Sequence, residues 1–254
     1  MARYDFNAQR LYVDSDLAEG ARAPLSKEQS NYLLNVLRLR DGDLLLAFNG
    51  RDGEWRARLA SVSRKEAALT IDSLERPQTQ PCDLHYVFAP LKHARLDYMV
   101  QKAIEMGAAK LIPALTHRTQ NSRVNVERMR ANAIEAAEQC GVLTIPEVDE
   151  PKKLEKLLAE WPSDRLLVFC DEDAPPGDPV ARLRAFAGDG QTDRPTPPLA
   201  VLVGPEGGFD AGERAMLAAL PFVVPVSLGP RILRADTAAV AALALVQAAL
   251  GDWR

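Results

Sequence analysis

The chain has 254 residues, of which 47% are apolar and 26% are charged, and this composition excludes an intrinsically disordered protein. Its length suits one large domain or two modest ones. The 31 lysines and arginines are outnumbered by 35 aspartates and glutamates, and the resulting net charge of -4 excludes a uniformly basic RNA-binding coat.

Residues 1–73 carry the pattern of a small β-domain. Leu44–Phe48 is an apolar run that ends in the hairpin-turn dipeptide Asn49-Gly50. Residues 55–59 then alternate strictly between apolar and charged side chains, as in a half-buried strand, and a third strand is predicted near residues 67–71. Short strands of this kind predict a small, mostly antiparallel β-barrel.

One helix and a linker complete this part of the chain. Ser26, with a glutamine three residues later, forms a capping box, and residues at helical spacing follow as far as Arg40. The stretch 75–81 carries two prolines and no apolar side chain, so we predict a linker over residues 74–82. The domain that follows is expected to occupy residues 83–254.

In this second domain, apolar strands alternate with helical patterns. A helix is predicted at Leu96–Met106, where apolar residues share one face and Gly107 supplies a C-terminal cap. Strands are predicted at residues 85–89, 110–115, 145–148, 166–170, 199–203 and 222–228. The alternation predicts an α/β fold with a mainly parallel sheet, in which ligands bind beyond the carboxyl ends of strands. Residues 171–198 are predicted as an exposed excursion with a short helix at 180–186.

A glycine-rich turn, Gly204–Gly208, directly follows the strand at 199–203. Asp210 and Glu213 then cap a helix predicted to run from about residue 211 to 220. Glycines let backbone amides approach a ligand closely, and a helix N-terminus favours a carboxylate or phosphate. The turn matches neither the dinucleotide nor the Walker motif, and on its own it favours a tight strand-to-helix turn over a ligand site.

A second glycine-bearing loop, Gly229–Asp236, follows the strand at 222–228. Two loops after two strands of one sheet are expected to converge on a single crevice. The apolar pair between Arg231 and Arg234 suits the wall of a pocket for a flat ligand such as adenine, with an arginine free for a polyanion. Asp236-Thr237 also fits simple capping of a helix that opens at Thr237 and runs to residue 250.

Positive charge gathers between Lys92 and Arg130, where eight cations stand against three anions. Some of these cations belong to solvated helix faces. Lys92, Arg118 and Arg123 instead lie in loops after strands, where they could contact phosphates.

The histidines and the helix end near Cys140 give only weak indications of a functional site. His85, His93 and His117 lack the spacing of metal ligands and any nucleophile motif, so no metal is expected. His85 is interpreted as a strand residue, whereas His117 could contact RNA. Glu138 with Cys140 could be a nucleophile site, but a helix end with a buried thiol is the preferred interpretation.

The cysteines and the apolar runs bear on the compartment. Cys82, Cys140 and Cys170 form no CxxC pair and are expected to be inert thiols in a reducing cytosol. The N-terminus lacks the apolar segment of a signal peptide, and the longest apolar run, Ala238–Leu250, is too short to span a bilayer. We therefore expect a cytoplasmic protein.

Four motifs occur in order along the second domain: Leu91–Gly107, Glu135–Gly141, Val203–Gly208 and Leu228–Arg234. Together they resemble the bacterial 16S ribosomal RNA uracil-N3 methyltransferases of the SPOUT superfamily, and the first domain looks like that family's PUA-like barrel. The resemblance implies a trefoil knot, S-adenosylmethionine as cofactor, a homodimer, and methylation of N3 of one uridine in the small ribosomal subunit.

The resemblance and the chemistry together nominate three sets of residues. The candidates to stabilise the anionic uracil or to accept its N3 proton are Arg231, Arg234, Glu206 and Asp236. The cofactor is expected to lie against Leu202, Gly204, Glu206, Gly207, Gly208, Leu228, Gly229, Ile232, Leu233 and Thr237. The ribosomal RNA is expected to contact Arg3, Arg38, Lys92, Arg95, Arg118 and Arg123, with help from Arg56 and Arg58 of the barrel.

Two positions depart from the family's pattern. Val142 stands where the family has arginine, which removes one candidate RNA contact. Ala235-Asp236 replaces the usual Thr-Glu pair, and the aspartate keeps the carboxylate but shortens its reach.

Other functions would share part of this pattern. A non-catalytic ribosome-binding or assembly factor would have the basic window, the cation-rich stretch from Lys92 to Arg130, but would need no ligand pocket. An enzyme with a phosphate-bearing cofactor would have the glycine loops, but neither the basic window nor the barrel. Methylation of another nucleotide, in ribosomal or transfer RNA, is a third alternative.

Overall fold

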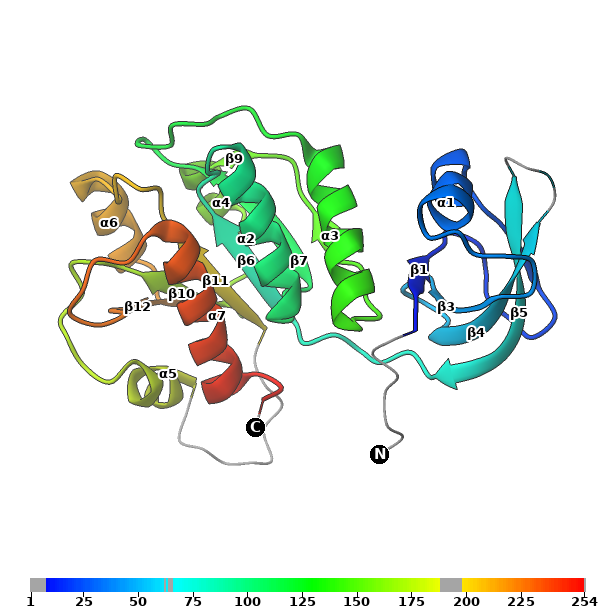
Figure 1. Cartoon of the computed structure of the whole chain (residues 1–254). Coiled ribbons are helices and arrows are strands. Elements are labelled where there is room, and N and C mark those ends of the chain that lie inside the picture. The colour runs from blue at the N-terminus through cyan, green and yellow to red at the C-terminus, as the bar shows by residue number, and fades with distance from the viewer. Residues whose placement is uncertain (1–7, 62, 64–65, 188–197, 254) are drawn as a thin grey trace. The chain divides into compact units, whose positions relative to one another are not determined.

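The structure is a computed structural model that describes residues 8–61, 63, 66–187 and 198–253. The chain forms two compact units, drawn in Figure 1. One unit comprises Met1–Gln80 with Ile134–Ile145, and the other comprises Pro81–Ala133 with Pro146–Arg254. Arg3, an expected RNA contact, lies outside the described residues.

The first unit is built on a five-stranded sheet with the strand order β1-β3-β4-β5-β2. Its strands are β1 (Arg10–Tyr12), β2 (Arg22–Pro24), β3 (Leu44–Phe48), β4 (Glu54–Ser61) and β5 (Ala67–Arg76). Strands β1 and β3 are parallel and the other neighbours are antiparallel. The prediction of a small, mostly antiparallel β-domain is thus confirmed, although β5 runs into the stretch predicted as linker.

The predicted capping box begins helix α1 (Lys27–Asn31). The Ser26 hydroxyl accepts the Gln29 amide at 3.1 Å, and the Gln29 side chain accepts the Ser26 amide at 3.0 Å. The helix continues as a π-helical turn, η1 (Tyr32–Val36), and ends there. The expected extension to residue 40 is wrong, because Arg38 adopts a φ of 57°, a left-handed conformation that terminates helices.

A buried ion-pair network joins the edge of this sheet to the end of α3 (Val126–Cys140), which belongs to the same unit from Ile134 onward. Arg10 and Glu54 are both buried and their side chains meet at 2.6 Å. Arg76 reaches the other carboxylate oxygen of Glu54 at 2.7 Å. Arg10 also donates to the carbonyl oxygens of Glu138 and Val142. The network satisfies charges that would be costly to bury alone.

The second unit is an α/β structure whose strand pairs are all parallel among the described residues. Its strands are β6 (Leu84–Phe88), β7 (Lys110–Leu115), β8 (Glu147–Val148), β9 (Lys152–Lys153), β10 (Leu166–Cys170), β11 (Leu199–Val203) and β12 (Val223–Val226). Its helices, apart from α3, are α2 (His93–Glu105), α4 (Leu154–Ala159), α5 (Pro179–Ala187), α6 (Ala211–Ala218) and α7 (Ala235–Leu250).

The strand order in this sheet is β12-β10-β11-β6-β7-β8, with β9 pairing β7. The chain therefore passes from β11 back across β10 to reach the outer edge at β12. This crossing is compatible with the trefoil knot expected from the resemblance. It also places the ends of β10, β11 and β12 side by side, because the three strands are parallel neighbours.

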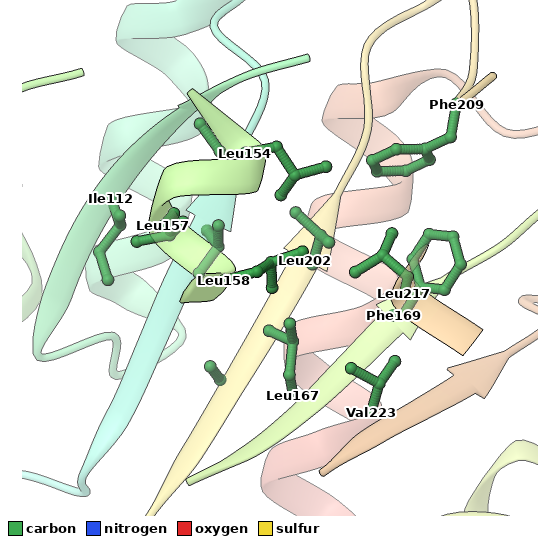
Figure 2. Close-up of a cluster of buried hydrophobic side chains, with 13 residues drawn as sticks. Ile112, Leu154, Leu157, Leu158, Leu167, Phe169, Leu202, Phe209, Leu217 and Val223 are labelled. Atoms are coloured by element: carbon green, nitrogen blue, oxygen red, sulfur yellow. The ribbon is translucent and has the colours of Figure 1, made fainter. Parts of the chain in front are cut away.

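Helices cover both faces of the sheet. Figure 2 shows Leu154, Leu157 and Leu158 of α4 against one face, where Leu202 of β11 is also buried. Helix α7 packs against β11, α2 and α5. Each fully buried leucine stabilises the fold by about 1.5–3 kcal/mol relative to an exposed one. None of the helices that the structure describes has both the length and the apolar character needed to span a bilayer.

Candidate functional site

A cavity of about 660 Å³ lies at the carboxyl ends of β10, β11 and β12. Residues 203–206, 208 and 209 line it after β11, and residues 226–235 line it after β12. The two glycine-bearing loops therefore meet, as their positions after neighbouring parallel strands predict. A third part of the wall comes from the end of β10 and the start of the predicted excursion, with Cys170, Asp171, Glu172, Ala174 and Pro176. The volume is within the range of small-molecule and cofactor sites.

Two glycines let the walls of this cavity approach each other. Gly208 has a φ of +68°, and a Cβ there would stand 2.3 Å from a carboxylate oxygen of Glu172. A Cβ on Gly204 would stand 2.4 Å from the ring of Phe209. At Gly204 the buried ring leaves no room for a side chain, and at Gly208 the positive φ disfavours one, so the turn presents bare backbone to the cavity. Such a cradle, with apolar side chains around it, fits a nucleoside-bearing cofactor such as S-adenosylmethionine.

The apolar lining comes from both loops and the strands before them. Val203, Val226, Leu228 and Leu233 contribute to the wall. Ile232 also lines the cavity, but 91% of its surface is exposed, so its side chain stands at the mouth. The remaining expected cofactor contacts lie elsewhere: Leu202 is fully buried in the core, and Gly207 and Thr237 are outside the lining.

Helix α7 begins at Ala235, two residues earlier than predicted. The N-cap residue is Arg234, whose backbone is extended, and its side chain makes no capping hydrogen bond to the helix. Asp236, outside the lining, lies in the first turn, where its carboxylate accepts the Arg234 guanidinium at 3.0 Å and the Thr237 amide at 3.0 Å. Asp236 is therefore not the N-cap residue, but its carboxylate accepts a first-turn amide and its charge favours the helix N-terminus.

Four of the expected functional side chains line the cavity and differ in their pairing. Arg95, from the first turn of α2, forms an ion pair with Glu206 of the glycine turn. Arg234 is paired with Asp236. Arg231 forms no ion pair with any residue that the structure describes, and its side chain is exposed. Arg231 is thus the lining arginine that is free to meet an anionic ligand.

One side of the cavity is acidic, and this feature was not predicted from the sequence. Arg214 of α6 forms ion pairs with three consecutive carboxylates, at 3.2 Å to Asp171, 2.9 Å to Glu172 and also to Asp173. Burial raises the pKa of Asp171, and Arg214 opposes this shift. The run of acids immediately after a buried strand was a signal that could have identified this wall. The start of this segment is largely exposed, as predicted, but it also forms a wall of the cavity, which was not predicted.

Two residues of the loop after β7 reach the glycine turn and the start of α6. The Arg118 guanidinium donates to the carbonyl oxygen of Gly207 at 2.7 Å. The His117 ring meets Asp210, the N-cap of α6, at 2.5 Å and Glu155 at 3.0 Å. The hydrogen bond to Asp210 is the main reason why the pKa of His117 is raised. These contacts are an alternative to the expected role of both residues at RNA.

Other expected RNA contacts lie on exposed surface. Arg38 is exposed in the first unit, and Lys92 and Arg123 are exposed in the second. Arg56 and Arg58 form ion pairs across the sheet with Glu75 and Asp72. None of these arrangements prevents contact with phosphate.

The cysteines and His85 are not arranged as nucleophiles or bases. Cys140 is exposed, so the expectation of a buried thiol there is wrong; the end of α3 leaves its side chain in solvent. Glu138 accepts the Tyr12 amide at 2.8 Å, a structural contact. Burial raises the pKa of the Cys170 thiol to about 12. Burial also lowers the pKa of His85 to about 4, consistent with its place in β6.

Comparisons with known proteins cover both units. A family model described as an RNA methyltransferase domain matches residues 78–247, and one described as an RNA methyltransferase PUA domain matches residues 25–72. The ribosomal RNA small subunit methyltransferase E of Rickettsia conorii is 31% identical over 240 residues, covering 94% of either chain. That of Synechocystis is also 31% identical, over 96% of this chain and 78% of its own.

Two solved structures with bound S-adenosylmethionine are also similar. The ribosomal RNA small subunit methyltransferase E of Neisseria gonorrhoeae superimposes with a TM-score of 0.82 at 26% identity, covering 98% of this chain and 100% of its own. A Legionella pneumophila protein in complex with the same cofactor gives a TM-score of 0.78 at 30% identity, over 96% and 98% of the two chains.

Proposed function

The chain belongs to the ribosomal RNA small subunit methyltransferase E family, and we propose that it transfers a methyl group from S-adenosylmethionine to N3 of a uridine in 16S ribosomal RNA. The observation that carries this proposal is the cavity in which both glycine loops meet at the carboxyl ends of parallel strands. An assembly factor without catalytic activity would have no need of such a cavity.

The cofactor is held by backbone and apolar side chains of this cavity. The turn at residues 204–208 and the loop at residues 228–233 supply amides and carbonyls at close range, because their glycines leave no Cβ in the way. When bound, S-adenosylmethionine supplies an electrophilic methyl group on its sulfonium. The chain's task is to align that methyl group with the acceptor nitrogen and to exclude water.

The acceptor nitrogen requires help because N3 of uracil carries a proton at neutral pH. Arg231 and Arg234 lie at the cavity, where a cation stabilises the uracil anion as the proton leaves. Each candidate carboxylate is paired with an arginine, Glu206 with Arg95 and Asp236 with Arg234. Glu206 is the better placed of the two to accept this proton, because it lines the cavity and Asp236 does not. N3 lies on the Watson–Crick edge, so the uridine enters unpaired or extruded.

The RNA is held by exposed cations outside the cavity. We assign phosphate contacts to Lys92 and Arg123 in the second unit and to Arg38 in the first. A second copy of the chain completes the active site in a homodimer, and the enzyme acts on the small ribosomal subunit in the cytoplasm. Each cationic contact is expected to steepen the dependence of RNA affinity on salt.

The proposal is tested by incubating the purified protein and S-adenosylmethionine, labelled in its methyl group, with small ribosomal subunits from cells that lack the enzyme. We expect label in 16S ribosomal RNA, and titration calorimetry is expected to show cofactor binding without RNA. Binding of subunits without cofactor binding would indicate the assembly factor instead. Labelling of transfer RNA alone would indicate another substrate.

A further inference from the structure

We propose that the loop after β7 clamps the glycine turn through His117 and Arg118, so that Arg118 is a positioning residue for the cofactor loop and not a phosphate contact. The proposal rests on the proposed function, because the turn that is clamped would hold the cofactor. Its evidence is a set of contacts between segments about 90 residues apart in the chain.

Arg118 fixes one peptide of the glycine turn. The turn is closed by a hydrogen bond from the Gly208 amide to the Pro205 carbonyl at 2.9 Å. The carbonyl of Gly207 is left outside this bond and accepts Nη1 of Arg118 at 2.7 Å. The stem of Arg118 also packs on Gly207, since a Cβ there would stand 3.6 Å from its Cβ and Cδ. Because a peptide unit is planar, holding this carbonyl also orients the Gly208 amide.

His117 holds the chain just after the turn. Its backbone amide donates to Glu213 at 2.8 Å, and Glu213 is only 2% exposed. The same glutamate accepts the Asp210 amide at 3.0 Å in the capping box of α6. The imidazole meets the Asp210 carboxylate on one side and Glu155 of α4 on the other. The start of α6 is thereby tied to the β7 loop and to α4.

The two anchors bracket Gly208, the residue that must keep a positive φ for the cavity wall to close. Loss of either anchor frees the turn to sample other conformations, and binding the cofactor must then order it again. A phosphate that took the guanidinium of Arg118 would compete with this contact. Arg123, on the same loop, is exposed and forms no hydrogen bond or ion pair with the described residues, so it is the cation available to RNA.

The test is titration calorimetry of the full-length protein with S-adenosylmethionine, with RNA affinity measured in parallel. Arg118→Ala is expected to raise the cofactor Kd about fivefold, which corresponds to the loss of roughly one ordinary hydrogen bond. Arg118→Lys, which can still donate to the Gly207 carbonyl, is expected to restore part of the loss, and His117→Gln is expected to weaken cofactor binding without changing RNA affinity.

Arg123→Ala is the matched control on the same loop. It is expected to weaken RNA binding and leave the cofactor Kd at the wild-type value. In methyl transfer, Arg118→Ala raises the KM for cofactor and Arg123→Ala raises that for RNA. The clamp is overturned if Arg118→Ala and His117→Gln both bind the cofactor with the wild-type Kd while Arg118→Ala loses affinity for RNA. Failure of the wild-type protein to bind cofactor would instead overturn the proposed function.

Discussion

The ring of Phe209 meets the ring of Phe169 edge-on, with the two centroids 4.9 Å apart. Both rings belong to the buried cluster drawn in Figure 2, which also contains Leu158 of α4 and Leu217 of α6. The ring of Phe209 also lies directly against Gly204, the first residue of the glycine turn. The position of this turn is therefore set by core packing as well as by its own glycines.

Gly204→Ala is expected to weaken cofactor binding strongly and to lower the stability of the fold moderately. The new Cβ would stand 2.4 Å from the Phe209 ring, and this ring is held by Phe169. The overpacking costs about 1–3 kcal/mol of unfolding free energy, and the displaced turn lowers cofactor affinity by about tenfold or more. Gly177→Ala is the control, because its Cβ would meet nothing within 4 Å. Wild-type cofactor affinity in Gly204→Ala would show that the close approach is unimportant.

Glu54→Ala is expected to destabilise the first unit by about 3–5 kcal/mol, because it leaves the buried guanidinium of Arg10 without its carboxylate. Thermal and urea unfolding of the full chain measure the loss. Asp72→Ala removes the partner of Arg58 in an exposed pair and is expected to cost less than about 1 kcal/mol. Equal losses in the two variants would argue against the buried network.

Acid is expected to weaken the fold through His85. Burial lowers the pKa of His85 from 6.5 to about 4, so between these values the unfolded chain binds a proton that the folded chain does not. Stability contributed by this group is complete above pH 6.5 and is lost as pH falls towards 4. The loss is on the order of 3 kcal/mol. The free energy of unfolding of His85→Gln is expected to fall less steeply than that of the wild type between pH 6.5 and 4. An equal dependence on pH in the two proteins would contradict the role assigned to His85.

Arg234→Ala is expected to slow methyl transfer about a hundredfold while the cofactor Kd changes little. Its guanidinium lies at the cavity wall and is expected to stabilise the uracil anion, which forms only as the reaction proceeds. Single-turnover rates with small subunits measure the effect. A wild-type rate would assign the cationic role to Arg231, whose replacement would then have the larger effect.

The strands and loops of the second unit could be predicted because their signals are local. The bounds of β7, β10 and β11 agree with the prediction residue for residue, since each strand is a short apolar run between polar or glycine-rich segments. The meeting of the two glycine loops followed from a general rule for parallel sheets. Helix ends were less predictable, as the left-handed Arg38 illustrates.

The side-chain partners of the site could not be predicted. Arg214 lies about 40 residues from the acids that it binds, and Arg118 lies 89 residues from Gly207. No periodicity or spacing links such residues, because only the fold brings them together. The same is true of Arg10 and Glu54 in the first unit. An arginine in a basic window can therefore bind RNA or donate a hydrogen bond to the backbone of its own chain, and sequence alone does not separate the two roles.

The measurement that tests the account most directly is mass spectrometry of nucleosides from 16S ribosomal RNA, taken from small subunits before and after reaction with the protein and S-adenosylmethionine. The account predicts the appearance of one N3-methyluridine per subunit, and a much lower yield when the Gly204→Ala variant is used at a cofactor concentration near the wild-type Kd. No new methylated nucleoside, or a methyl group on a ribose or another base, would contradict it.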